Sequence, residues 1–177
     1  MAINIVMCAH PRAGTNWLKN RLVSRGYYEC NEWLHVSEEI YNSQFWPRIN
    51  LAEQENRDFG IKVFPNHLNS RSYSWEQFIS LLPHEKTAYI RVKRLDIEAA
   101  AKSWSGAECS GSWFGSSQNK GRLSEVDDYV KRLNGINEYW DDNLTGEHLF
   151  VAYEDMVADM DEQLNLITSY IDRVKGR

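Results

Sequence analysis

The stretch INIVMCAHPRAGTNWLKNRL, residues 3–22, decides how the chain folds. Asn4–Ala9 forms an apolar run that is too short for a helix and is typical of a strand covered on both faces. The loop HPRAGT follows, and a helical pattern then covers Thr15–Arg25 and ends before Gly26, which we expect to cap the helix. A strand, a polar loop and a helix in this order predict a parallel α/β unit. In such units the loop after the strand is where a ligand binds.

The rest of the chain repeats this alternation of short apolar segments and helical patterns. A capping-box sequence at Ser74–Gln77 and an Ala-rich run at Leu95–Trp104 each predict a helix, and the Gly- and Ser-rich stretch 105–121 predicts a loop. We therefore expect an α/β fold of three layers, with a parallel central sheet flanked by helices, in a single domain over residues 1–177. The remaining predicted strands are Gly60–Phe64, Thr87–Val92 and His148–Tyr153. One further helix is predicted to begin at Ser124, and a final helix to contain Leu164, Ile167 and Ile171.

Composition limits the possible partners. The 177 residues carry a net charge of -5, so we expect no general nucleic-acid binder, and any anionic ligand must meet a local basic cluster. Mean hydropathy is -0.58, and no apolar run approaches the roughly 18 residues of a membrane span. The start of the chain lacks the basic and long apolar regions of a signal peptide. Cys8, Cys30 and Cys109 are widely separated, which suits free thiols in a reducing compartment. We expect a cytoplasmic protein.

The opening loop resembles a phosphate-binding loop only in part. The nucleoside triphosphatase motif G-x-x-x-x-G-K-[ST] requires a Lys and a hydroxyl residue after its second Gly. Aligned on Gly14, this chain has Ala9, Thr15 and Asn16 in place of the first Gly, the Lys and the hydroxyl residue. Backbone N–H groups at the start of a helix still form an anion site, and Arg12 adds a fork of donors. The alternative is an ordinary strand-to-helix turn with Thr15 as N-cap.

The sequence HPRAGTNWLKNRL resembles the 5′-phosphosulfate loop of sulfotransferases that use 3′-phosphoadenosine 5′-phosphosulfate (PAPS). In that loop the basic residue precedes the Gly. Arg12, Gly14, Thr15 and Leu18 match it, whereas Ala13 and Asn16 replace hydroxyl residues. The resemblance implies that this segment binds the cofactor through Pro11, Arg12, Ala13, Gly14, Thr15, Asn16 and Trp17.

A second anion site is implied after the third predicted strand, in IRVKRLDIEAAAKSWSG, residues 90–106. Sulfotransferases bind the 3′-phosphate with an Arg at the end of this strand and a Ser about two helical turns later. Arg94 and Ser103 fit this spacing and resemble the pattern of the bacterial trehalose sulfotransferase family, which continues into Gly111-Ser-Trp113. In the competing register Arg91 would precede Ala99, which has no hydroxyl. The alternative without a ligand is a surface basic cluster beside a solvated Ser.

The base that would deprotonate the acceptor is implied by RGYYECNEWLH, residues 25–35. The same family has a Glu at the matching position that acts as base, which points to Glu32. Burial against Trp33, Tyr27 and Tyr28 would make it a better base. His67 is the rival, because histidine is the base in the eukaryotic cytosolic relatives.

Two further stretches match the sulfotransferases. Lys62 belongs to a Gly-[Ile/Leu]-Lys stretch and could be structural or face the sulfonate. The sequence LFVAYEDMVAD, residues 149–159, matches a Tyr-Glu-Asp-[Leu/Met] signature that we interpret as mainly architectural. The resemblance extends from Ile3 to about Ile171, although the chain is short for the family.

Together these matches predict a PAPS-dependent sulfotransferase with a P-loop NTPase-like sulfotransferase fold. It would move a sulfonate to a hydroxyl of a sugar or another small metabolite and release 3′,5′-adenosine bisphosphate (PAP). Arg12 would stabilise the leaving phosphate, and no metal, nucleic acid or membrane would be needed; a homodimer is possible. The alternatives are a non-catalytic descendant that binds a nucleotide or protein, and a small metabolite kinase with a degenerate P-loop.

Overall fold

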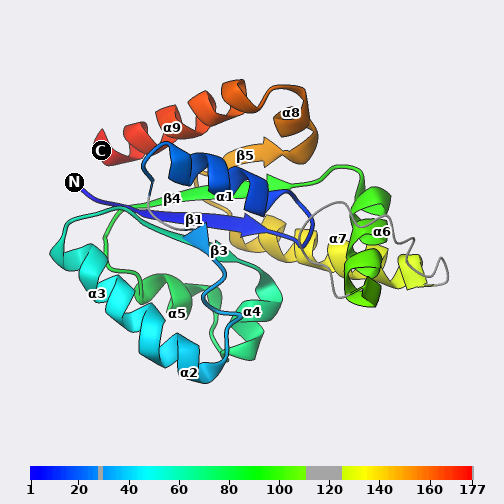
Figure 1. Ribbon diagram of the computed structural model, residues 1–177, viewed down its shortest axis with the longest axis horizontal. Coiled ribbons are helices and arrows are strands. Elements are labelled where there is room, and N and C mark those ends of the chain that lie inside the picture. Colours follow the sequence, from blue (N-terminus) through cyan, green and yellow to red (C-terminus); the bar gives the residue numbers. More distant parts are fainter. Residues whose placement is uncertain (28–29, 111–124, 177) are drawn as a thin grey trace.

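The computed structural model describes residues 1–27, 30–110 and 125–176. Within these residues a parallel sheet has the strand order β2-β3-β1-β4-β5, with β1 at its centre and a two-residue β2 at one edge (Figure 1). The predicted parallel α/β architecture is therefore confirmed. The strands are β1 (Asn4–Ala9), β2 (Cys30–Asn31), β3 (Phe59–Val63), β4 (Thr87–Lys93) and β5 (Leu149–Ala152).

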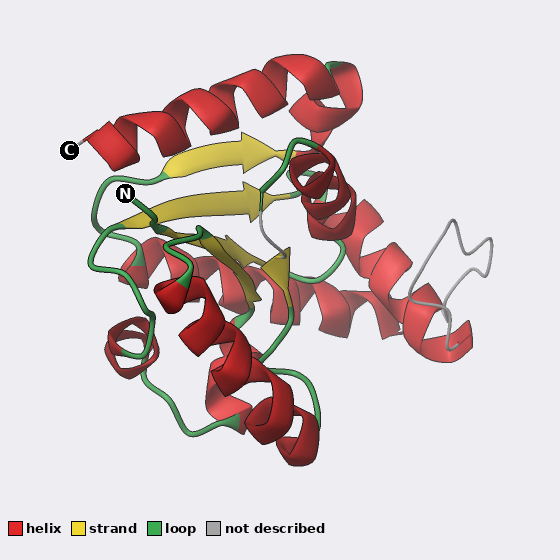
Figure 2. Cartoon of the chain, turned by 60° about the vertical axis from the view of Figure 1, so that its left-hand side comes forward, coloured by secondary structure: helices red, strands yellow, loops and turns green. Residues whose placement is uncertain are grey.

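Helices cover both faces of the sheet and make three layers. Helices α1, α8 and α9 lie on one face, and α3, α4, α5 and α7 lie on the other (Figures 1 and 2). The helices are α1 (Thr15–Ser24), α2 (Glu38–Ile40), the π-helix η1 (Tyr41–Phe45), α3 (Trp46–Gln54), α4 (Pro65–Ser70), α5 (Trp75–Ser80), α6 (Ile97–Ser110), α7 (Val126–Asn143), α8 (Tyr153–Ala158) and α9 (Met160–Gly176).

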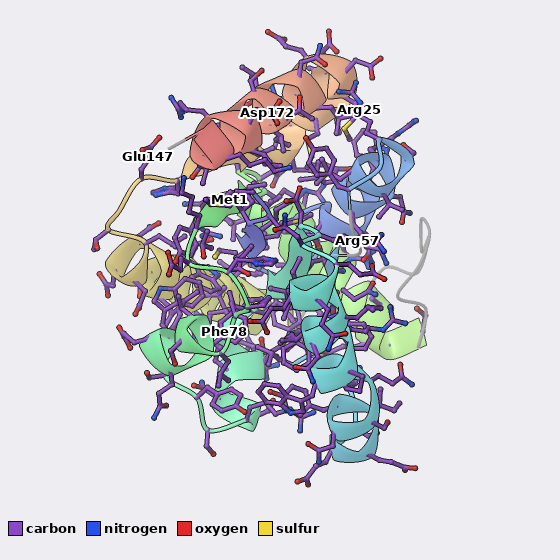
Figure 3. All side chains as sticks on the ribbon, turned by 90° about the vertical axis from the view of Figure 1, so that its left-hand side faces the viewer. Met1, Arg25, Arg57, Phe78, Glu147 and Asp172 are labelled. Carbon is purple, nitrogen blue, oxygen red and sulfur yellow. The ribbon has the colours of Figure 1, made fainter. Side chains whose placement is uncertain are left out.

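The position of β1 at the centre of the sheet explains why its run of apolar residues is continuous. Successive side chains of a strand point to opposite faces, and here both faces are covered. Ile5 and Met7 pack with α1 and α9, whereas Val6 and Cys8 pack toward the opposite helices. Phe78 of α5 lies among the closely packed side chains on that second side (Figure 3).

Most of the predicted elements are confirmed within one or two residues, and the capping box of Ser74 and Gln77 is present at the start of α5. The predicted loop over 105–121 is wrong at its beginning, because α6 continues to Ser110. Ser105, Gly106 and Ala107 are buried there, so tertiary packing outweighs the low helix propensity of Ser and Gly. The remainder of that stretch, and the predicted helix start at Ser124, lie outside the described residues.

The topology places the switch point of the sheet at the carboxyl ends of β1 and β4. The chain leaves β1 toward β2 on one side of the sheet and leaves β4 toward β5 on the other, and ligands of α/β sheets bind where neighbouring connections diverge in this way. Across the described ranges, no helix combines the length and the apolar character needed to cross a bilayer.

Candidate functional site

The loop between β1 and α1 has an unusual backbone. Arg12 has a φ of 67° and Gly14 a φ of 82°, both in the left-handed region. Gly14, not Thr15, occupies the N-cap position of α1, so the N-cap expected at Thr15 is wrong. A Cβ at Gly14 would lie 2.7 Å from Cδ2 of Tyr153, which shows how closely α8 approaches the loop. Only Gly satisfies both the backbone conformation and this contact.

Two buried side chains hold the backbone just before this turn. Trp140 of α7 donates from Nε1 to the carbonyl of Ala9 at 2.8 Å. His10 bonds with Nδ1 to the carbonyl of Pro11 at 2.8 Å, and its Nε2 accepts from the backbone N–H of Arg94 at 3.0 Å. Sequence reasoning did not identify His10. The only signal was its position between a strand and the Pro-Arg pair.

The groups predicted to bind the two ends of PAPS lie next to each other. Arg12 donates from Nε to Oγ of Ser103 at 2.8 Å, which joins the opening loop to α6. The guanidinium of Arg94 lies 4.7 Å from the centre of the Tyr153 ring. Burial, followed by the charge of Arg94, lowers the pKa of Arg12. Two cations this close favour an anion between or beside them.

The structure separates Arg91 from this group. Arg91 is buried, and its guanidinium donates to Oδ1 of Asn137 in α7 and to the carbonyls of Cys8 and Val92. Burial lowers the pKa of Arg91 to about 10. Of the two competing registers, the one with Arg94 and Ser103 brings both of its members to the opening loop.

A second cluster lies at the ends of β2 and β3. Lys62 Nζ is 2.6 Å from Oε1 of Glu32 and also donates to Oδ1 of Asn16 in the opening loop. The Lys62 side chain is only 3% exposed, whereas that of Glu32 is 32% exposed. One buried ammonium therefore positions both the predicted base and a residue of the predicted cofactor loop.

The aromatic environment expected around Glu32 is different in the structure. Trp33 packs into the core with Phe45, Tyr27 packs on the opposite face of the sheet, and Tyr28 lies outside the described residues. In the structure the Glu32 carboxylate is paired with the ammonium group of Lys62.

His67 is buried at the start of α4, with its ring stacked on His35 at 4.6 Å between centroids and 4.7 Å from Phe64. Burial lowers the pKa of His67 to about 4, although the charge of Glu32 acts in the opposite direction. The ring is therefore neutral near neutral pH. Of the two candidate bases, Glu32 has the more exposed side chain.

The Tyr-Glu-Asp signature opens α8, directly after β5, and Glu154 contacts the turn after β4. The two carboxylate oxygens of Glu154 accept from the backbone N–H groups of Leu95 and Asp96, at 3.0 and 3.2 Å. Burial alone would raise the pKa of Glu154, but these N–H groups and the charge of Arg94 lower it. This arrangement agrees with an architectural role, because Glu154 fixes the turn that carries Arg94.

A cavity of about 540 Å³ is lined by Pro83, His84 and Thr87 near the start of β4, at the opposite end of the strands from the Arg12 loop. In the described parts of the chain, no group of three or more His, Cys, Asp or Glu side chains is placed to hold a metal ion.

Comparison of the sequence with known proteins does not assign it to a family. No family model matches the sequence, and no curated protein matches it.

Proposed function

We propose that this protein is a cytoplasmic, PAPS-dependent sulfotransferase with the P-loop-like fold of that family, acting on a hydroxyl of a sugar or small metabolite. The observation that carries the proposal is the hydrogen bond of 2.8 Å between Arg12 Nε and Ser103 Oγ, with Arg94 beside it. These three residues come from three separate segments. Their motifs are the ones that the sequence resemblance assigns to the 5′ and 3′ ends of the cofactor.

The donors in this region fit a ligand with two anionic ends. The Nε of Arg94 is buried and has no hydrogen-bond partner among the described atoms, and an unpaired buried donor is costly unless a ligand satisfies it. Arg94 and Ser103 would hold the 3′-phosphate. Arg12 and the N–H groups that open α1 would hold the 5′-phosphosulfate.

The cluster of Lys62 and Glu32 would remove the proton from the acceptor hydroxyl. PAPS would supply the sulfonate and leave as PAP. The acceptor oxygen would form its bond to sulfur as the bond between sulfur and the bridging phosphate oxygen breaks, and the phosphate would keep the electron pair. Glu32 would take the acceptor proton on Oε2, since Oε1 is bound to Lys62. Arg12 would stabilise the charge that develops on the phosphate.

Binding measurements with PAP, 5′-AMP and Mg·ATP test the assignment of the cofactor. We expect PAP to bind at least about tenfold tighter than AMP, because a phosphate bound by Arg adds charge-assisted hydrogen bonds. Arg94→Ala should remove this preference. Arg21→Ala, on the exposed side of α1, is the matched control and should retain it.

The same titrations separate the alternatives. Binding of Mg·ATP without PAP would favour the metabolite kinase and contradict the proposal. Tight PAP binding without transfer of labelled sulfonate from PAPS to a panel of sugars, phenols and small alcohols would favour the non-catalytic descendant.

A further inference from the structure

We propose that His10 is a positioning residue that links the loop for the 5′-phosphosulfate to the arginine for the 3′-phosphate. The identity of the two ligand groups rests on the proposed function above, whereas the link itself is a feature of the protein. His10 lies at the end of β1, where the opening loop begins, and its side chain is fully buried.

The tautomer of His10 follows from its partners. The backbone N–H of Arg94 can only donate, so Nε2 must be the acceptor and carries no proton. The proton is then on Nδ1, which donates to the carbonyl of Pro11. One neutral ring thus joins the carbonyl of Pro11, in the opening loop, to the backbone N–H of Arg94, the residue after β4.

The surroundings of His10 keep the ring neutral. Burial lowers the pKa of His10 to about 4, and the nearby charges of Arg91 and Lys93 act in the same direction. The hydrogen bond that Nδ1 donates to the carbonyl of Pro11 acts in the opposite direction but does not cancel the effect of burial. Protonation on Nε2 would replace its acceptor with a donor facing the N–H of Arg94, and the link would break.

The consequence concerns how the two anion sites are spaced. Arg12 lies two residues after His10, and the Arg94 backbone is bonded to the same ring. Glu154 fixes the next two N–H groups, those of Leu95 and Asp96, so the turn after β4 is held at three consecutive positions. The two cations are therefore arranged before a ligand binds, which reduces the ordering that binding requires.

Two substitutions distinguish the hydrogen bond to Pro11 from the hydrogen bond to Arg94. In His10→Asn the side-chain N–H can still donate to Pro11, but no acceptor reaches Arg94. In His10→Gln the side-chain oxygen can reach the position of Nε2 and accept from Arg94. Both keep a polar side chain in the site, and thermal melting checks that each variant folds.

The first measurement is amide hydrogen exchange of Arg94 in the protein without ligand. We expect exchange about tenfold faster in His10→Asn than in His10→Gln, because a buried hydrogen bond contributes roughly this factor. The amide of Val151, in β5, should exchange alike in both. Equal exchange of the Arg94 amide in the two variants would overturn the link, whatever the protein binds.

The second measurement is the affinity ratio of PAP to 5′-AMP. His10→Asn should lower this ratio about tenfold, and His10→Gln should preserve it. In an Arg94→Ala background the difference between the two variants should vanish, since His10 acts through Arg94. An unchanged ratio in His10→Asn, with PAP bound by the wild type, would refute the positioning role alone. A wild type that does not bind PAP would instead refute the proposed function, and the exchange data would still decide the link.

Discussion

Lys62 and Glu32 show how one residue can connect two parts of a site. Lys62 reaches Glu32 and Asn16 at once, and its burial leaves it few other conformations. The sequence left its role open between a structural one and one facing the sulfonate. The ammonium of Lys62 holds one carboxylate oxygen of Glu32, so under the proposed function Lys62 would act through Glu32 and leave the other oxygen for the acceptor.

At this scale we predict that Glu32→Gln keeps PAP affinity within about twofold but lowers turnover by about a hundredfold or more, because general base catalysis contributes that much. Calorimetry with PAP and sulfonate transfer from PAPS measure the two quantities. Lys62→Met should also lower turnover, since the carboxylate loses its partner. Lys19→Met is the control, because Lys19 bonds to Asn31 instead of Glu32. Full activity of Glu32→Gln would assign the base elsewhere.

At the scale of elements, the contact between α8 and Gly14 constrains the shape of the opening loop. Tyr153 and Met156 of α8 lie against Gly14, and the ring of Tyr153 also carries the guanidinium of Arg94. Glu154, next to Tyr153, caps the turn after β4. Helix α8 is only six residues long, yet it contacts both proposed anion sites.

We predict that Gly14→Ala destabilises the protein by about 2 kcal/mol or more, because the left-handed backbone disfavours Ala and the added Cβ would overlap Tyr153. Gly135→Ala is the matched control. Gly135 lies inside α7 with open space around it, so Ala should stabilise by roughly 0.5–1 kcal/mol. Denaturant unfolding measures both. Equal and small effects would contradict the close contact of the loop with α8.

At the scale of the whole molecule, two buried neutral histidines make stability depend on pH. The pKa values of His10 and His67 are each lowered to about 4, mainly by burial. In the unfolded chain a histidine titrates near 6.5, so between the two pKa values the unfolded state binds more protons. This contribution to stability is complete above about pH 6.5 and is lost as the pH falls toward about 4.

We therefore expect the free energy of unfolding to fall between about pH 7 and about pH 5, by at most about 1.4 kcal/mol per pH unit for each buried histidine. His67→Gln should make this dependence shallower, and His10→Gln should do the same. His148→Gln, at an exposed position, should leave it unchanged. The slopes come from unfolding at several pH values. A wild type whose stability rises on acidification would contradict the buried neutral state.

Local patterns in the sequence predicted the sheet and most helices because their physical causes are local. Short apolar runs marked β1, β3, β4 and β5, and Ser74 with Gln77 marked the start of α5. The helices between residues 38 and 54 were not predicted, because no start signal was recognised there. The length of α6 was also missed, since it depends on packing against α7.

The sequence by itself determined the α/β class, the order of its segments and the position of the opening loop after the central strand, since these follow from hydrophobic period and residue type. Only the tertiary structure showed that Arg91 is buried against Asn137 while Arg94 lies beside the opening loop, joined Arg12 to Ser103, paired Lys62 with Glu32 and revealed the link through His10. Each of these contacts joins residues at least 30 positions apart. The packing of the layers decides which charged side chains meet at the carboxyl ends of the strands. No local pattern in the sequence records this.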